Sequence, residues 1–229
     1  MGISQFGQDQ WVIDVLHGMR GGFFLDSGAA DGVMGSNTLR LEREFAWTGI
    51  CVEPNACYWD ELVRNRTAVC APYCLYSRNG TVKFLEAGPL GGIAAHQSEA
   101  SLGAIADLPA SALGPSGQTN RIRRTCRTPS ALLREFRAPP VIDYWSLDTE
   151  GSEFEILRSF PFEEFGVRLL TVEHNYGPDR PRIARFLAGK GYICLGSLGV
   201  DDCYVLPGAL PPSSTRFRRT QNPSRSMGV

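Results

Sequence analysis

Long apolar runs are absent from this chain, and no segment of its 229 residues is apolar enough for long enough to cross a bilayer. The first residues also lack the charged-then-apolar layout of a signal peptide, so we expect a cytoplasmic protein that does not contact a membrane. An excess of either charge is missing too, because 23 Lys and Arg face 24 Asp and Glu, for a formal net charge of −1. This balance argues against a nucleic-acid partner.

Close cysteine spacing is also missing. The chain has seven cysteines, an odd number, and none of them forms a C-x-x-C pair. Disulfide scaffolds and zinc ribbons need tighter patterns, so buried free thiols in a reducing compartment are expected. One disulfide stays open at this stage, because Cys194 and Cys203 could face each other across a hairpin.

Short apolar runs alternate with helical stretches along the chain, which is the pattern of a parallel α/β sheet. We expect one domain over residues 1–206, followed by a polar, basic tail over residues 207–229. Sheet strands are expected at residues 23–26, 47–52, 68–75, 141–147 and 167–172, with a final hairpin of 192–195 and 203–206. Helices are expected at residues 5–16, 36–45, 58–65, 130–136, 150–159 and 182–190.

Residues 87–120 differ from the rest of the chain because they are rich in Gly, Ala, Ser and Pro and show no sustained period. Such a stretch within a compact domain predicts a mobile, lid-like insertion. Before it, the Asn79-Gly80 turn predicts a hairpin strand at 81–85. After it, the alternation of residues 121–127 predicts an edge strand.

Four acidic residues come directly after predicted strands. They are Asp26, Glu53, Asp148 and Glu173. In an open α/β sheet, ligands bind at the carboxyl ends of the strands, so all four side chains are expected along one edge of the sheet. This recurrence is the main indication of a functional site.

The turn after the first strand carries a glycine pattern that is unusual for nucleotide binding. Gly28 allows close backbone approach to a ligand, but the order G-A-A-D-G replaces the G-x-G-x-x-G that holds a pyrophosphate. Asp31 within it suits a cationic group, and Glu53, one strand later, can take both hydroxyls of a ribose. The pair favours a nucleoside without phosphates and disfavours a nicotinamide-dependent oxidoreductase. The alternative is that this turn only connects the strand to the next helix tightly and binds no ligand.

Several segments together carry a resemblance to a known family. They are SQFGQD (Ser4–Asp9), FFLDSGAADG (Phe23–Gly32), SNT (Ser36–Thr38), GICVEPN (Gly49–Asn55), IDYWSLDTEGSEFEIL (Ile142–Leu157) and TVEHN (Thr171–Asn175). With these motifs the chain resembles the FkbM family of methyltransferases up to about residue 206. The segment before Arg121 and the basic tail have no good counterpart.

The resemblance implies a Rossmann-like class I methyltransferase fold: a mostly parallel seven-stranded sheet with helices on both faces and an antiparallel C-terminal hairpin. It implies S-adenosylmethionine as methyl donor and O-methylation of a sugar or another small, hydroxylated natural product. A catalytically silent adapter with the same fold and an N-methyltransferase are the alternatives, and a homo-oligomer stays open. The implied cofactor residues are Asp26, Gly28, Asp31 and Asn37 for the methionine part, Glu53 for the ribose and Asn55 near the adenine.

Catalytic candidates follow the two later strands. Asp148 ends one strand and Glu173 and His174 end the next, so they are expected to converge. One hypothesis makes His174 the general base for an acceptor hydroxyl, with a carboxylate orienting its ring. The other is a Mg²⁺ site formed by Asp148 together with Glu173, His174 or both. Glu150 and Glu153, predicted on one helix, can instead simply favour its positive N-terminus.

Overall fold

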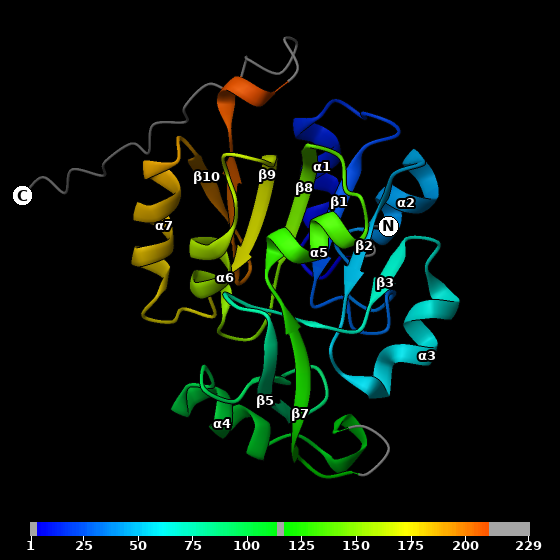
Figure 1. Ribbon diagram of the computed structural model, residues 1–229, viewed down its shortest axis with the longest axis vertical. Helices are drawn as coiled ribbons and strands as arrows, with labels where there is room; N and C mark the ends of the chain where they lie inside the picture. The colour runs from blue at the N-terminus through cyan, green and yellow to red at the C-terminus, as the bar shows by residue number, and fades with distance from the viewer. Residues whose placement is uncertain (1–3, 114–116, 211–229) are drawn as a thin grey trace, which may run out of the picture.

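The main sheet of the protein has seven strands. The computed structural model describes residues 4–113 and 117–210, and its strand order is β10-β11-β9-β8-β1-β2-β3 (Figure 1). The strands are β1 (Phe23–Ser27), β2 (Thr48–Val52), β3 (Val69–Ala71), β8 (Val141–Leu147), β9 (Gly166–Glu173), β10 (Ile193–Leu198) and β11 (Asp201–Val205). The first five run parallel, and β11 pairs antiparallel with both β9 and β10. The predicted fold class is confirmed.

Helices cover both faces of this sheet because alternate strand residues point to opposite sides. Leu25 of β1 belongs to one buried cluster and its neighbour Phe24 to another. The Leu25 cluster includes residues of α5 (Pro129–Glu135), α6 (Glu153–Ser159) and α7 (Arg180–Gly189). The Phe24 cluster includes residues of α1 (Gln8–Val15), α2 (Leu39–Phe45) and α3 (Ala56–Asn65). Both faces of the parallel strands are therefore buried, as their nearly continuous apolar sequence requires.

A second, smaller sheet lies beyond the carboxyl ends of β8 and β9 (Figure 1). Its order is β4-β7-β5-β6, formed by β4 (Cys74–Leu75), β5 (Gly80–Glu86), β6 (Gly92–Ile93) and β7 (Asn120–Arg127). The chain between β6 and β7 also forms α4 (Glu99–Ala106) and the short 3-10 helix η1 (Ala110–Ala112). This unit lies over the edge of the main sheet at which the strands end and the four acids that follow them are found.

The small sheet corrects three expectations. The strand expected at 68–75 is split, because β3 joins the main sheet and β4 joins the small one. The strand at 81–85 does not form a hairpin with the strand before it, since β5 pairs antiparallel with β7 from Gly80↔Cys126 to Glu86↔Asn120. The strand at 121–127 is not an edge strand, because β7 lies between β4 and β5.

Two further expectations concern the insertion and the tail. Residues 87–120 contain regular structure, in α4 and β6, whereas their mobility stays a prediction. The helix η2 (Pro207–Ala209) begins the segment expected as a tail, and residues 211–229 lie outside the described residues. Within residues 4–113 and 117–210, every helix is too short or too polar to span a membrane.

Candidate active site

A cavity of about 640 Å³ opens at the carboxyl ends of the parallel strands, between the main sheet and the small one. Its volume is in the range of small-molecule and cofactor sites. All four acids that follow predicted strands line this cavity, namely Asp26, Glu53, Asp148 and Glu173. Glu150 lines it as well. Phe84 and Ile93 of the small sheet complete one apolar wall. The expected convergence of the strand ends is therefore present.

Gly28 brings two strand ends into contact. Its φ of +95° lies in the left-handed region, and a Cβ at this position would overlap the backbone carbonyl oxygen of Asp148. The Gly28 N–H donates to Val52 O at 2.9 Å, and the Asp148 N–H donates to Ser27 O at 3.0 Å. The turns after β1 and β8 can approach this closely only because residue 28 has no side chain.

Glu53 follows β2 and has a fixed carboxyl group. Its Oε2 accepts the Ala30 N–H at 2.9 Å, and its Oε1 accepts the Asn55 N–H at 2.7 Å. Burial raises the pKa of Glu53 to about 7, against these two backbone hydrogen bonds, which lower it. A carboxylate has about four lone-pair sites, so the ionised group can accept further donors from the cavity.

Two asparagines line the same cavity with defined orientations. The Asn37 Nδ2 donates to Ser146 Oγ at 2.9 Å, which leaves its Oδ1 buried without a hydrogen-bond partner among the described residues. The Asn55 Oδ1 accepts the Cys57 N–H at 3.2 Å and so caps α3. The unpaired Asn37 oxygen is expensive to bury unless a ligand donor reaches it.

Asp26, near the end of β1, and Asp31, in the turn after it, already form hydrogen bonds within the protein. Asp26 Oδ2 accepts the Thr38 hydroxyl at 2.5 Å and lies 3.7 Å from the buried Arg66 guanidinium. Asp31 Oδ1 accepts the N–H groups of Val33 and Met34, both at 2.9 Å. Both acids line the cavity, but Asp26 also contacts the side chains of Thr38 and Arg66, and Asp31 also binds two backbone N–H groups.

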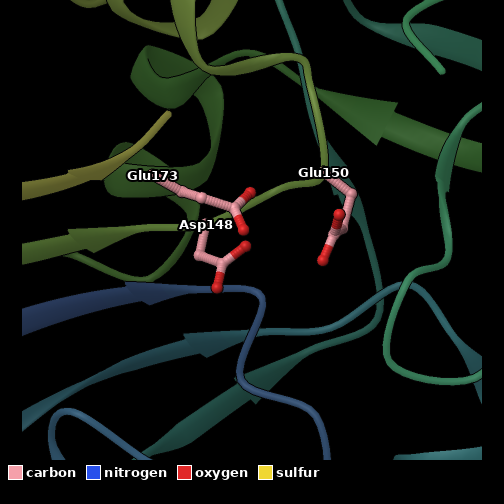
Figure 2. A group of neighbouring side chains, drawn as sticks. All are labelled: Asp148, Glu150 and Glu173. Carbon is pink, nitrogen blue, oxygen red and sulfur yellow. The ribbon is translucent and has the colours of Figure 1, made fainter. Parts of the chain in front are cut away.

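Three carboxyl groups meet at the other end of the cavity. One oxygen from each of Asp148, Glu150 and Glu173 lies within 4.8 Å of the others. Figure 2 shows the carboxyl groups of Asp148 and Glu173 close together, with Glu150 entering from a neighbouring loop. We call these three residues the carboxyl cluster.

Burial raises the pKa of every member of the carboxyl cluster. The pKa of Asp148 rises to about 7, and a hydrogen bond from Glu173 limits the rise. The pKa of Glu150 rises to about 9, through burial and then the charge of Asp148. The pKa of Glu173 is also raised, first by burial and then by the charge of Asp148. Burial therefore favours the neutral form of each carboxyl group in the cluster.

Glu150 is the cluster member whose position the sequence analysis misplaced. It was expected on a helix from residue 150, but α6 begins at Glu153. Glu150 has a φ of 58° and Gly151 one of 109°, so the chain turns here before the helix starts. Glu153 holds that turn, because its carboxylate accepts N–H groups from Thr149 at 2.8 Å and from Gly151. The structural role expected for Glu153 fits these contacts.

His174 does not join the carboxyl cluster. Its Nδ1 accepts the Tyr176 N–H at 3.0 Å, which requires the proton of the neutral ring to be on Nε2. That Nε2 lies 3.5 Å from Asp202 Oδ1, and burial lowers the pKa of His174. The side chain faces a second cavity and is absent from the wall of the first. Of the three residues expected to bind a metal ion, Asp148 and Glu173 lie together with Glu150 in the carboxyl cluster, and His174 lies outside it.

The comparison with protein-family models shows the class of chemistry. The family model described as methyltransferase FkbM domain matches residues 26–194. No curated protein sequence matches the chain. Among solved structures, the chain is similar to a precorrin-6y C5,15-methyltransferase from Geobacter metallireducens GS-15, with 10% identity and a TM-score of 0.43, over 86% of this chain and 84% of that one.

Proposed function

This chain belongs to the FkbM family of methyltransferases, and we propose that it transfers the methyl group of S-adenosylmethionine to a hydroxyl group of a sugar or another small acceptor. One observation carries the proposal. A single cavity is lined by the Glu53 carboxyl group, which two backbone N–H groups hold in place, and by the carboxyl cluster. The first suits a nucleoside, and the second suits removal of a proton from an acceptor.

The residues around the cavity fit S-adenosylmethionine as donor. Glu53 would accept both ribose hydroxyls, since its orientation is already set by two backbone N–H groups. Asn55, at the start of α3, would lie near the adenine. The unpaired Oδ1 of Asn37 offers an acceptor for the ammonium group.

The methionine part would extend along the turn after β1. Gly28 leaves the room for it, and Asp26 and Asp31 supply negative charge beside the positive ammonium and sulfonium groups. When bound, the donor supplies a methyl group on a positively charged sulfur, which is displaced without a covalent enzyme intermediate.

Asp148 is the proposed general base. The Asp148 carboxylate would take the proton of the acceptor hydroxyl as its oxygen accepts the methyl group, and the donor would leave as the neutral thioether S-adenosylhomocysteine. A base is most effective when its pKa is near the working pH, and burial places that of Asp148 at about 7. Protonated Glu173 donates a hydrogen bond to Asp148 and so keeps the negative charge there.

We assign the base to Asp148 rather than to His174 because the ring of His174 has no free lone pair. Its Nδ1 is occupied by the Tyr176 N–H, and its Nε2 carries the proton towards Asp202. His174 is a positioning residue in this account: it holds the loop in which the Asn175 Nδ2 donates to Glu173 Oε1 at 2.7 Å.

A divalent cation is the second candidate for activating the hydroxyl. Three carboxyl oxygens within 4.8 Å of one another are the ligand type that Mg²⁺ prefers. Chelation separates the two mechanisms: EDTA leaves the rate unchanged if Asp148 acts alone, and it abolishes turnover, with rescue by Mg²⁺, if a cation does the work.

The Asp148→Asn variant tests the base directly. We expect it to bind S-adenosylhomocysteine as the wild type does and to lose roughly 10²–10⁴-fold in methyl transfer. The wild-type rate should rise with pH through about 7, because the base works only when ionised. Glu163→Gln, at an exposed side chain outside both cavities, is the matched control. Unchanged transfer in Asp148→Asn would exclude this residue as the base.

A further inference from the structure

A second cavity, of about 340 Å³, lies directly beside the first. Four residues line both cavities: Leu90, Glu150, Glu173 and Asn175. Two members of the carboxyl cluster therefore stand in the wall between them. A molecule in the second cavity would reach the same carboxyl groups that a donor in the first cavity approaches from the other side.

The second cavity is formed between the insertion and the main domain. One wall comes from α4, with Ala100, Ser101 and Ala104 on the face turned to the cavity. The opposite wall comes from the start of α7, with Arg180 and Ile183. Figure 1 shows α4 below the main sheet, on the side of α6 and α7. The insertion thus contributes one wall of the site.

The charged groups around this cavity give an anionic ligand no free partner. Its acids include Glu150, Glu173 and Asp179, and Asp179 is already paired with Arg182 at 2.6 Å. Arg180 is its one lining Arg or Lys among the described residues, and it is neutralised by Asp202, with nitrogen–oxygen distances of 2.6 and 2.9 Å. A phosphate group would find no unpaired Arg or Lys on the described walls.

The remaining surface combines apolar and hydroxyl groups. Leu90, Ala104 and Ile183 offer apolar contact, while Ser98 and Ser101 line the α4 side with hydroxyl groups. The Ser98 Oγ already accepts the Ser101 N–H at 3.0 Å, so its position is fixed at the start of the helix. Such walls match a ring with an apolar face and hydroxyl groups at its edge, as in a neutral sugar.

We propose that the second cavity is the acceptor site and that it takes a neutral, hydroxyl-bearing ring such as a glycoside, in preference to phosphorylated or nucleotide-linked forms. This inference rests on the proposed function, because it places the acceptor of that reaction. The reacting hydroxyl enters the carboxyl cluster between Glu150 and Glu173, and its proton passes on to Asp148.

The test fills the cavity from the α4 side. Ala104→Trp places an indole in the second cavity, and Ala106→Trp, on the same helix but outside both cavities, is the control. Ala100→Trp, also on the cavity wall, serves as a second filling variant. Each ¹⁵N-labelled protein, saturated with S-adenosylhomocysteine, is titrated with the methyl glycosides of glucose, galactose, mannose and rhamnose, and with glucose 1-phosphate. Amide shifts report binding.

At least one neutral glycoside should shift the amide signals of residues 100–104 and 177–180 in the wild type and in Ala106→Trp. The filling variants should lose tenfold or more of that affinity while their S-adenosylhomocysteine affinity stays unchanged. Absence of any glycoside shift, shifts that persist in both filling variants, or stronger binding of glucose 1-phosphate at this site would overturn the acceptor assignment and leave the donor site standing. Failure of the wild type to bind S-adenosylhomocysteine would overturn the proposed function as well.

Discussion

Replacing Glu53 with alanine tests the donor site most sharply. The ionised carboxylate would accept both ribose hydroxyls, and a hydrogen bond to a charged group contributes about 1.5–3 kcal/mol. Loss of two such bonds amounts to about 3–6 kcal/mol, or roughly 10²–10⁴-fold in dissociation constant. We expect Glu53→Ala to weaken S-adenosylhomocysteine binding by this factor in isothermal titration calorimetry at pH 8.

The pH dependence of S-adenosylhomocysteine binding by the wild type tests the role of Glu53 independently. Burial raises the pKa of Glu53 to about 7, so below pH 7 the group is mostly protonated in the free protein. The ribose hydroxyls favour the ionised form, and binding must therefore release a proton at low pH. Affinity should rise by roughly tenfold between pH 6 and pH 8 and then level off. Glu53→Ala should not show this rise.

The control separates loss of the ribose contacts from loss of the fold. Glu61→Ala removes a carboxylate from the exposed side of α3, outside the cavity, and should bind as the wild type does. Thermal unfolding of Glu53→Ala is needed because the variant also frees the N–H groups of Ala30 and Asn55. A folded Glu53→Ala protein with wild-type affinity would refute the ribose assignment.

Three further predictions concern the turn, the carboxyl cluster and the histidine. Gly28→Ala should destabilise the protein and abolish donor binding, because the new Cβ meets the carbonyl oxygen of Asp148; native unfolding temperature and affinity would contradict this. Glu150→Gln should stabilise the protein at pH 9 but not at pH 5. The folded pKa of Glu150, about 9, lies above its ordinary value, so wild-type stability is lost as pH rises towards 9. A gain of at least ~1 kcal/mol, about 2–4 °C in Tm, is expected for a chain of this size; equal Tm values at pH 9 would contradict it. His174→Asn keeps an acceptor for the Tyr176 N–H and should keep methyl transfer within about tenfold of the wild type; a fall of roughly 10²–10⁴-fold would restore His174 as the base.

The strand ends were predictable from sequence because a buried parallel strand leaves a clear pattern. The strand expected at 141–147 matches β8, and the acid that follows it lies in the cavity as a parallel sheet requires. The strand at 68–75 was not predictable in the same way. Its apolar pattern continues through residues that turn from β3 into β4, and the pattern does not say which sheet each half joins.

Glu150 and His174 show where prediction of side-chain positions stops. The sequence Glu150-Gly-Ser-Glu153 resembles the acidic first turn of a helix, but positive φ angles at Glu150 and Gly151 delay the helix and turn the Glu150 carboxyl to the cavity. His174 follows a strand, as Asp148 does. The chain after it enters the left-handed region at Asn175 and Tyr176, and the Tyr176 N–H binds the ring. The positive φ angles of Glu150, Asn175 and Tyr176 occur at residues other than glycine, so the sequence does not mark them.

Transfer of a ¹³C-labelled methyl group tests the central claim most directly. The protein is incubated with S-[methyl-¹³C]adenosylmethionine and a set of neutral glycosides and polyols, and the products are analysed by NMR and mass spectrometry. We predict a ¹³C-methyl ether on an acceptor oxygen, formed one for one with S-adenosylhomocysteine and lost in Asp148→Asn. Label on nitrogen, or bound donor with no transfer to any acceptor, would contradict the assignment as an O-methyltransferase.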